Sequence, residues 1–237
     1  MAREFLGWLG APAGGRWLDV GCGTGELCRG IVAGASPGSV TGVDPSEGFL
    51  EYARSQGGGI DYGAGDAQAL PFGDGAFDAV VSGLVLNFVP EPAKGAAEML
   101  RVTRAGGVVG AYVWDYAEGM QFMRHFWDAA VELDPAAADK DEGNRFTICR
   151  PDGLAELFAE ADGVQTRPLD VPTNFGSFDD FWAPFEGGTG TAPSYVASLS
   201  PEGKERLRES LRSRLPVGQN GSIELVARAW AVRGRIG

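Results

Sequence analysis

The sequence has little of what metal sites, disulfide frameworks and membrane helices require. It contains one histidine, His125, and three cysteines, Cys22, Cys28 and Cys149, without the spacing of a zinc site. An odd and sparse cysteine count indicates reduced thiols, as in a cytoplasmic protein. No apolar run approaches the roughly 20 residues that a membrane helix needs, and the first residues do not resemble a signal peptide. We therefore expect a cytoplasmic protein without a metal ion and without stable membrane insertion.

Positive charge is also scarce. Lysine and arginine number 20 against 32 aspartates and glutamates, which gives a formal net charge of −12. A field of that sign repels phosphate backbones, so we expect a small-molecule partner and no nucleic acid. The composition, 44% hydrophobic and 22% charged, is that of a folded globular protein. It leaves the oligomeric state open.

What the sequence does contain is an alternation of short β-rich runs with helical patterns in its first half. The predicted strands are residues 16–20, 39–44, 60–64, 76–82 and 108–114. Strands that alternate with helices are typical of a parallel sheet covered on both faces. The predicted fold is therefore α/β, with a doubly wound, mostly parallel sheet of seven strands of which the last is antiparallel.

The rhythm changes in the second half, where helical patterns dominate. We predict one domain over residues 1–237, with a core over residues 16–116 that would bind a cofactor. A helical cap for the substrate, with one sheet strand, covers residues 117–215, and a closing strand covers residues 221–233. Within the cap, residues 134–144 are polar and are expected to form a loop.

A glycine-rich turn, LDVGCGTG at residues 18–25, joins the first predicted strand to a helix. Such a turn lets the backbone approach a ligand closely and points helix amides at it. The dinucleotide pattern GxGxxG would require a third glycine at the position of Glu26. The carboxylate of Asp19 suits a cationic group better than a pyrophosphate, which it would repel. The turn therefore favours a ligand other than NAD.

Polar residues also end the next three strands of the predicted sheet. Asp44 follows the second strand about 20 residues after the turn, where an acid can accept the ribose hydroxyls of an adenosine-containing cofactor. Asp66 follows the third strand, and Ser82 ends the fourth, beside the point where open α/β sheets bind ligands. Taken singly, each acid has another explanation. Asp44 could simply cap the helix that follows it, and Asp66 could be a solvated loop acid.

Taken in order, these segments resemble the successive motifs of class I S-adenosylmethionine-dependent methyltransferases. The segments are LDVGCGTG, VTGVDPS, GDAQALPF, FDAVVSGLVLNFV and LRVTRAGGVVGAYVW. They are most similar to the small-molecule branch that includes ubiquinone and menaquinone biosynthesis methyltransferases, and they cover roughly residues 16–114. The resemblance implies a Rossmann-like fold, S-adenosylmethionine as cofactor, and methyl transfer to an oxygen, nitrogen or carbon atom of a small molecule.

The resemblance also implies roles for matched residues at the methionine end of the cofactor. Gly21 and Gly23 would admit the methionine part. Asp19 would orient its amino group through water, and the carbonyl of Ser82 would hold the ammonium.

At the adenosine end, the resemblance assigns five further residues. Asp44 would hold the ribose, with Pro45 and Ser46 bordering the adenine. Asp66 would accept the adenine amino group, and the amide of Ala67 would face a ring nitrogen.

The acceptor side is less defined. His125 lies on a predicted amphipathic helix and could serve as general base, although a partly exposed helix histidine is the commoner case. An aromatic set in the second half could line an apolar pocket or form a core seam; it comprises Phe122, Phe126, Trp127, Phe175, Phe178, Phe181, Trp182 and Phe185.

Alternatives of other classes stay open at this point. The chain could bind S-adenosylmethionine without catalysis, as a regulatory protein, or be an NAD-type oxidoreductase. About fifteen residues precede Arg16. The cover over the cofactor that many relatives build there would then be short, missing or supplied by another subunit.

Overall fold

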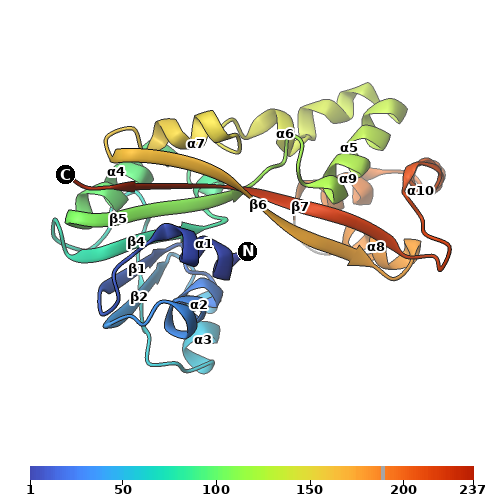
Figure 1. Ribbon diagram of the computed structural model, residues 1–237. Helices are drawn as coiled ribbons and strands as arrows, with labels where there is room; N and C mark the ends of the chain where they lie inside the picture. The colour runs from blue at the N-terminus through green and yellow to red at the C-terminus, as the bar shows by residue number, and fades with distance from the viewer. Residues whose placement is uncertain (188–189) are drawn as a thin grey trace. The chain divides into compact units, whose positions relative to one another are not determined.

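A single sheet of seven strands runs through the computed structural model, which describes residues 1–187 and 190–237 (Figure 1). The strands are β1 (Arg16–Val20), β2 (Ser39–Asp44), β3 (Asp61–Ala64), β4 (Phe77–Gly83), β5 (Thr103–Trp114), β6 (Asp162–Phe175) and β7 (Ile223–Arg235). Their order is β3-β2-β1-β4-β5-β7-β6, so the strand order reverses between β1 and β4. The predicted α/β fold is confirmed.

Helices connect these strands. They are α1 (Ala2–Leu9), α2 (Glu26–Gly34), α3 (Glu47–Ser55), α4 (Pro92–Val102), α5 (Gln121–Leu133), α6 (Glu142–Arg145), α7 (Pro151–Leu157), α8 (Phe178–Glu186), α9 (Thr191–Ser198) and α10 (Pro201–Arg214), with the 3-10 turns η1 (Leu86–Phe88) and η2 (Pro135–Lys140). In Figure 1, α1, α2 and α3 lie on one side of the sheet and α4 and α7 on the other. The double winding leaves the carboxyl ends of the parallel strands free to bind a ligand.

Hydrogen bonds establish the strand directions. β1 pairs in parallel with β2 and β4, and β2 and β4 pair in parallel with β3 and β5. The amide of Gly106, early in β5, donates to the carbonyl of Ile236, and the amide of Asp115, just after β5, donates to Arg228. Since the start of β5 meets the end of β7, this pair is antiparallel. The structure thus contains the predicted antiparallel last strand.

The structure contains one helix that was not predicted, and it differs from one local expectation. A helix, α1, precedes the first strand, and Phe5 on it packs against Tyr112 of β5 with ring centroids 4.9 Å apart. The expected loop at residues 134–144 contains η2 and α6, each begun by an aspartate, Asp134 or Asp141, whose side chain accepts a backbone amide. Such caps stabilise short helical turns in polar sequences.

The chain divides into two compact units. The first unit comprises Met1–Val113, Arg150–Leu169 and Trp230–Gly237, and the second comprises Trp114–Cys149 and Asp170–Ala229. The division into cofactor-binding core, cap and closing strand within one domain stays a prediction. Residues 188 and 189, which belong to the predicted cap, lie outside the described residues.

Most of the aromatic set belongs to the core of the second unit. Phe126, Trp127 and Phe181 are fully buried, and Trp182 and Phe185 are almost so. The rings of Phe126 and Phe185 stack with centroids 4.3 Å apart. These contacts favour the core seam over the lining of an open pocket, because buried rings already have partners.

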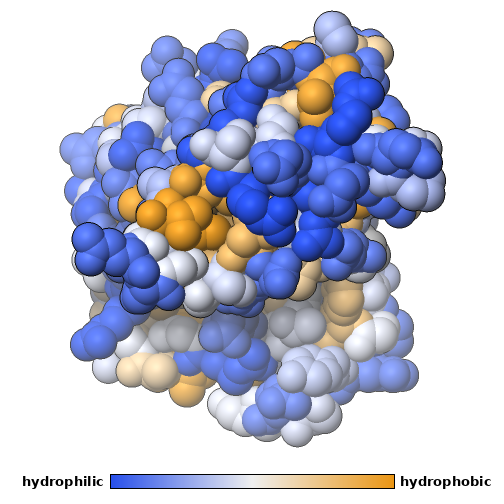
Figure 2. All heavy atoms as spheres, turned by 90° about the vertical axis from the view of Figure 1, so that its right-hand side faces the viewer, coloured by the Kyte–Doolittle hydropathy of each residue, from blue (hydrophilic) through white to orange (hydrophobic). Residues whose placement is uncertain are grey.

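The surface agrees with the composition. Figure 2 shows a face on which hydrophilic side chains prevail and hydrophobic ones form small groups. In the described ranges, no helix is both long and apolar enough to cross a membrane. No group of three or more histidine, cysteine, aspartate or glutamate side chains within those ranges could hold a metal ion.

Candidate cofactor site

The carboxyl ends of β1, β2, β3 and β4 bring the predicted cofactor residues together in the first unit. Val20 at the end of β1 pairs with Val43, and Asp44 at the end of β2 pairs with Ala64. The amides of Gly21 and Cys22 both donate to the carbonyl of Val43, at 2.8 and 2.9 Å. The loops that follow neighbouring strands are therefore held side by side.

The glycine turn has a backbone that other residues rarely adopt. Gly21, Gly23 and Gly25 have φ angles of 74°, 51° and 83°. A Cβ on Gly21 would overlap Val85, and one on Gly25 would overlap the hydroxyl of Tyr62. A Cβ on Gly23 would meet no atom within 4 Å. Gly21 and Gly25 are therefore required for packing, whereas Gly23 borders open space where a ligand can approach the backbone.

Asp44 is buried and joins two loops. Its Oδ2 accepts from the Gly23 amide at 2.9 Å, and its Oδ1 accepts from the Ser46 amide at 2.9 Å. Ser46 itself begins α3, since its hydroxyl accepts from the Phe49 amide. Helix capping belongs to Ser46, while Asp44 ties the glycine turn to the start of α3. Each carboxylate oxygen can accept a second hydrogen bond, so these contacts are compatible with ribose binding.

Asp19 lies deeper, with 1% of its surface exposed. Its Oδ2 accepts from the Cys28 thiol at 3.2 Å, whereas Oδ1 is buried and has no partner among the described residues. Burial, opposed by the Cys28 hydrogen bond and reinforced by Asp44, raises the pKa of Asp19 to about 7. A buried carboxylate oxygen without a partner suits a cationic group bound beside it.

Asp66 and Ala67 follow β3. Asp66 is exposed, and its carboxylate accepts from the backbone amide of Gln68 at 2.9 Å and from the Gln68 side chain. These bonds lower the pKa of Asp66 below its usual range. Ala67 is buried. Gln68 thus donates to the carboxylate that the sequence assigned to the adenine amino group. The side-chain oxygen of Gln68 also accepts from the Glu91 amide.

Ser82 ends β4 and is almost fully buried. Its hydroxyl donates to the carbonyl of Val20 at 2.8 Å, which connects the central strands just before the glycine turn. Two residues later, Leu84 has a φ of 61°, and its amide donates to the carbonyl of Tyr112 at 2.7 Å. A left-handed leucine is strained. The sharp turn after β4 therefore lies at the predicted site.

Comparisons with known proteins agree with this geometry. A model of a methyltransferase domain family matches residues 18–110. A demethylmenaquinone methyltransferase of Staphylococcus aureus strain MRSA252 is 39% identical over 173 residues, covering 67% of this chain and 72% of the relative. The chain belongs to the class I S-adenosylmethionine-dependent methyltransferases. The family and the Rossmann-like fold predicted from the sequence are confirmed.

Two further matches show how far the similarity extends. A demethylmenaquinone methyltransferase of Renibacterium salmoninarum is 37% identical over 143 residues, or 60% of this chain and 59% of the relative. The phosphoethanolamine N-methyltransferase 2 of Haemonchus contortus, solved in complex with S-adenosyl-L-methionine, has a TM-score of 0.60 and 16% identity. That match covers all of this chain and 52% of the other, and it shows the shared fold.

The structure places side chains beside the candidate site that sequence reasoning missed. Tyr62 on β3 pairs with Gly42, which pairs with Asp19, so all three positions lie on one face of the sheet. A Cβ on Gly42 would come within 2.9 Å of the sulfurs of Cys22 and Cys28. Because Gly42 has no side chain, the thiols of Cys22 and Cys28 fit beneath the glycine turn. Only the pairing of strands reveals this, because the residues are far apart in sequence.

Polar atoms in this methyltransferase also lack partners. The hydroxyl of Tyr62 and the Nδ2 of Asn87 are buried without a hydrogen bond in the described part of the chain. Burial raises the pKa of Tyr62 well above its usual range. Tyr62 lies outside the motifs that the sequence reasoning used, whereas Asn87 lies within FDAVVSGLVLNFV, five positions after Ser82, and was not singled out there.

His125 lies in the second unit on α5 and is half-buried. Burial and the nearby Arg214 lower its pKa, while Asp128 opposes them. The imidazole is therefore neutral at neutral pH, as a general base must be. No contact of His125 with a substrate tests the role, so the general base stays a prediction.

Proposed function

We propose that this chain transfers a methyl group from S-adenosylmethionine to an oxygen, nitrogen or carbon atom of a small molecule. The observation that carries the proposal is the buried Oδ1 of Asp19, which has no partner among the described residues and lies at the end of the strand before the glycine turn. That atom suits the positive amino group of a methionine moiety. The open space at Gly23 suits the same ligand.

Different residues at the carboxyl ends of the strands would bind the two ends of the cofactor. Asp19, the backbone at Gly21 and Gly23, and the carbonyl of Ser82 would hold the methionine end. The adenosine end would contact Asp44, Pro45, Ser46, Asp66 and Ala67. Asp66 is exposed, and an adenine amino group would take the place of the Gln68 side-chain hydrogen bonds that its carboxylate accepts.

When bound, S-adenosylmethionine supplies a methyl group activated by a positive sulfur. The residues of this chain then have to align the acceptor and exclude water, and a base is needed only for an acceptor that starts protonated. His125, with its neutral imidazole, is our candidate for that base. This chemistry requires no catalytic triad.

The first acceptor class to test comes from the relatives. Two of them are named demethylmenaquinone methyltransferase, so a quinone-type compound leads an acceptor screen. The net charge of −12 favours an acceptor without phosphate groups, because a negatively charged protein repels them. A cytoplasmic location, expected from the sparse cysteines, stays part of the proposal.

Titration calorimetry with S-adenosylmethionine and with S-adenosylhomocysteine tests the cofactor. We expect both to bind, and Asp44→Asn to weaken binding roughly 10- to 100-fold, as for loss of charge-assisted hydrogen bonds. Asp74→Asn is the matched control, because Asp74 is a surface acid with 83% of its side chain exposed and paired with Arg101. The control should bind like the unchanged protein.

Other outcomes discriminate among the alternatives. Failure of both cofactor forms to bind would contradict the proposal. Binding without turnover of labelled methyl donor on any acceptor would favour a regulatory protein. An increase in NADH fluorescence on mixing would favour an oxidoreductase, which the glutamate at position 26 disfavours.

A further inference from the structure

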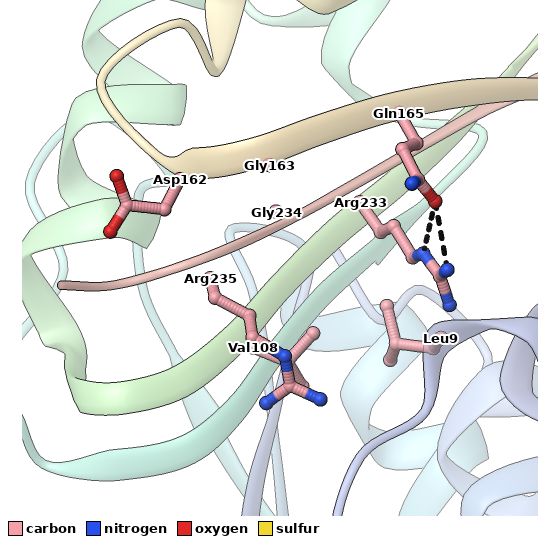
Figure 3. A pocket seen from close by; sticks show the side chains of 8 residues that line it. All are labelled: Leu9, Val108, Asp162, Gly163, Gln165, Arg233, Gly234 and Arg235. Carbon is pink, nitrogen blue, oxygen red and sulfur yellow. Dashed lines mark hydrogen bonds between the residues drawn. The ribbon is translucent and has the colours of Figure 1, made fainter.

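A cavity of the first unit, apart from the glycine turn, lies where the start of β6 meets the end of β7. It measures about 210 Å³ and is lined by Arg233 and Arg235 with the apolar side chains of Leu9 and Val108 (Figure 3). The two arginines are separated by one residue, Gly234, so their side chains leave the strand on the same face. Figure 3 shows the guanidinium group of Arg233 beside Gln165 and Leu9 and that of Arg235 beside Val108.

Neither guanidinium has an acidic partner in the part of the chain that the structure describes. Within the described ranges, no carboxylate oxygen lies within 4.0 Å of Arg233 or Arg235, although acids exceed bases by 12 in the whole sequence. Asp162 also lines the cavity, but its carboxylate points away from both guanidinium groups in Figure 3. Two neighbouring positive charges without a counter-ion repel each other, and a bound anion would relieve that repulsion.

The neutral partners of Arg233 occupy most of its donors. Its Nε and Nη2 donate to Gln165 at 3.2 and 2.8 Å, its Nη1 donates to the carbonyl of Trp8, and the group lies 4.6 Å from the centre of the Trp8 ring. These bonds hold Arg233 in place and connect it to the end of α1. Arg233 is thus a fixed positive charge at the cavity wall.

Arg235 donates fewer hydrogen bonds than Arg233. Its one hydrogen bond in the described part of the chain runs from Nη2 to the carbonyl of Gly10 at 3.2 Å. The carbonyl end of α1 carries about half a negative charge, which offsets only part of the two positive charges. Arg235 is exposed, so four of its five donors are available to a ligand that enters from solvent.

We propose that Arg235, assisted by Arg233, binds a phosphate group in this cavity. Guanidinium groups recognise tetrahedral oxyanions through paired hydrogen bonds, and a dianion matches two positive charges better than a carboxylate does. The cavity is smaller than the roughly 300–1,000 Å³ of pockets for drug-sized ligands, so it suits an ion or a small phosphate monoester. Leu9 and Val108, which are almost fully buried, lie behind the charges, and apolar surroundings of this kind strengthen the attraction.

Titration calorimetry of the full chain tests the proposal, with sodium phosphate and with glycerol 3-phosphate as probes at constant ionic strength set by sodium chloride. We expect one site per chain and binding at least about tenfold weaker in Arg235→Gln, as for loss of a charge-assisted hydrogen bond. Arg3→Gln is the matched control, since it removes the same charge from an exposed residue of the same unit. It should bind phosphate like the unchanged protein.

Each outcome either identifies the source of the phosphate group or overturns the proposal. Binding of inorganic phosphate identifies a free ion as sufficient, and binding of glycerol 3-phosphate alone identifies a phosphorylated metabolite. Equal binding of acetate, equal weakening in Arg3→Gln, or no heat beyond that of chloride would each overturn it. S-adenosylmethionine binding by Arg235→Gln, measured without phosphate, checks the fold and keeps this test separate from that of the methyl-donor site.

Discussion

Asp19 connects the stability of this protein to its proposed cofactor. The carboxyl is almost fully buried and has a pKa raised to about 7, so ionising it within the folded chain is costly. A group with a raised carboxyl pKa holds its proton more tightly when folded than when unfolded. Its contribution to the free energy of unfolding is therefore full below about pH 4 and is lost as the pH rises toward 7.

We therefore expect Asp19→Asn to be more stable than the unchanged protein at pH 8, by a few kcal/mol. The neutral amide removes the buried charge, and the difference should shrink as the pH falls toward 5. The same variant should bind S-adenosylmethionine more weakly, because the amide cannot neutralise an ammonium group. Urea unfolding without cofactor at several pH values and calorimetric titration measure the two effects.

Asp78 supplies the opposite case as a control. Hydrogen bonds from Arg104 and Arg16 lower the pKa of Asp78 to about 2, so its ionised form stabilises the fold. That contribution is present above about pH 4 and is lost as the pH falls through 2. Asp78→Asn should lower the urea midpoint at pH 8, whereas an unchanged midpoint in Asp19→Asn would contradict the assigned cost of burying Asp19.

At the scale of elements, the glycine turn between β1 and α2 combines packing with ligand access. Gly21 has a φ of 74° and faces Val85, which begins the turn toward η1. Gly73, by contrast, is an exposed loop glycine without a positive φ, and a Cβ there would meet no atom within 4 Å. Both residues are glycine, but only Gly21 has a backbone conformation and a neighbour that oppose a side chain.

Gly21→Ala should lower the free energy of unfolding by about 2–4 kcal/mol, because the left-handed backbone and the overlap with Val85 both oppose a methyl group. Gly73→Ala should change it by less than about 0.5 kcal/mol. Thermal or urea denaturation of both variants measures the difference. Equal stabilities would show that the turn tolerates a Cβ, contrary to its conformation.

Element boundaries were predictable where composition and periodicity agreed. β1, β2, β3 and β4 match the expected ranges to within a residue, since each combines a clear apolar pattern with a nearby glycine or proline. α1 was missed because its glycine, Gly7, and its short length weaken the helical pattern. Packing of Phe5 and Leu9 into the core stabilises the helix, and such packing is invisible in eight residues read alone.

At the scale of the whole molecule, the net charge of −12 predicts no general affinity for nucleic acids. We expect no binding of short duplex DNA or RNA at physiological salt up to about 100 μM protein, the weak end of non-specific binding. Fluorescence anisotropy of labelled duplexes measures this. Salt-sensitive binding in the micromolar range would contradict the prediction and would point to a local basic surface.

The sequence by itself determined the fold class, the family and the positions of the methyl-donor motifs. Those features depend on residues close in sequence: glycines that permit positive φ, an acid at the end of each strand, and short apolar runs between them. The location of Asp19, Asp44 and Ser82 at one edge of the sheet could be predicted because each lies at the carboxyl end of a strand, and parallel strands end at the same edge.

Only the tertiary structure decided what surrounds those residues. The contact of Asp19 with Cys28 depends on the packing of α2 against β1. The buried hydroxyl of Tyr62 and the charged cavity at Arg233 and Arg235 depend on strands that are far apart in sequence. The same is true of the aromatic set, whose burial shows a core where the pattern alone also allowed a pocket. Burial and hydrogen bonding between distant residues set these properties, because desolvation and neighbouring charges exist only once the chain has folded.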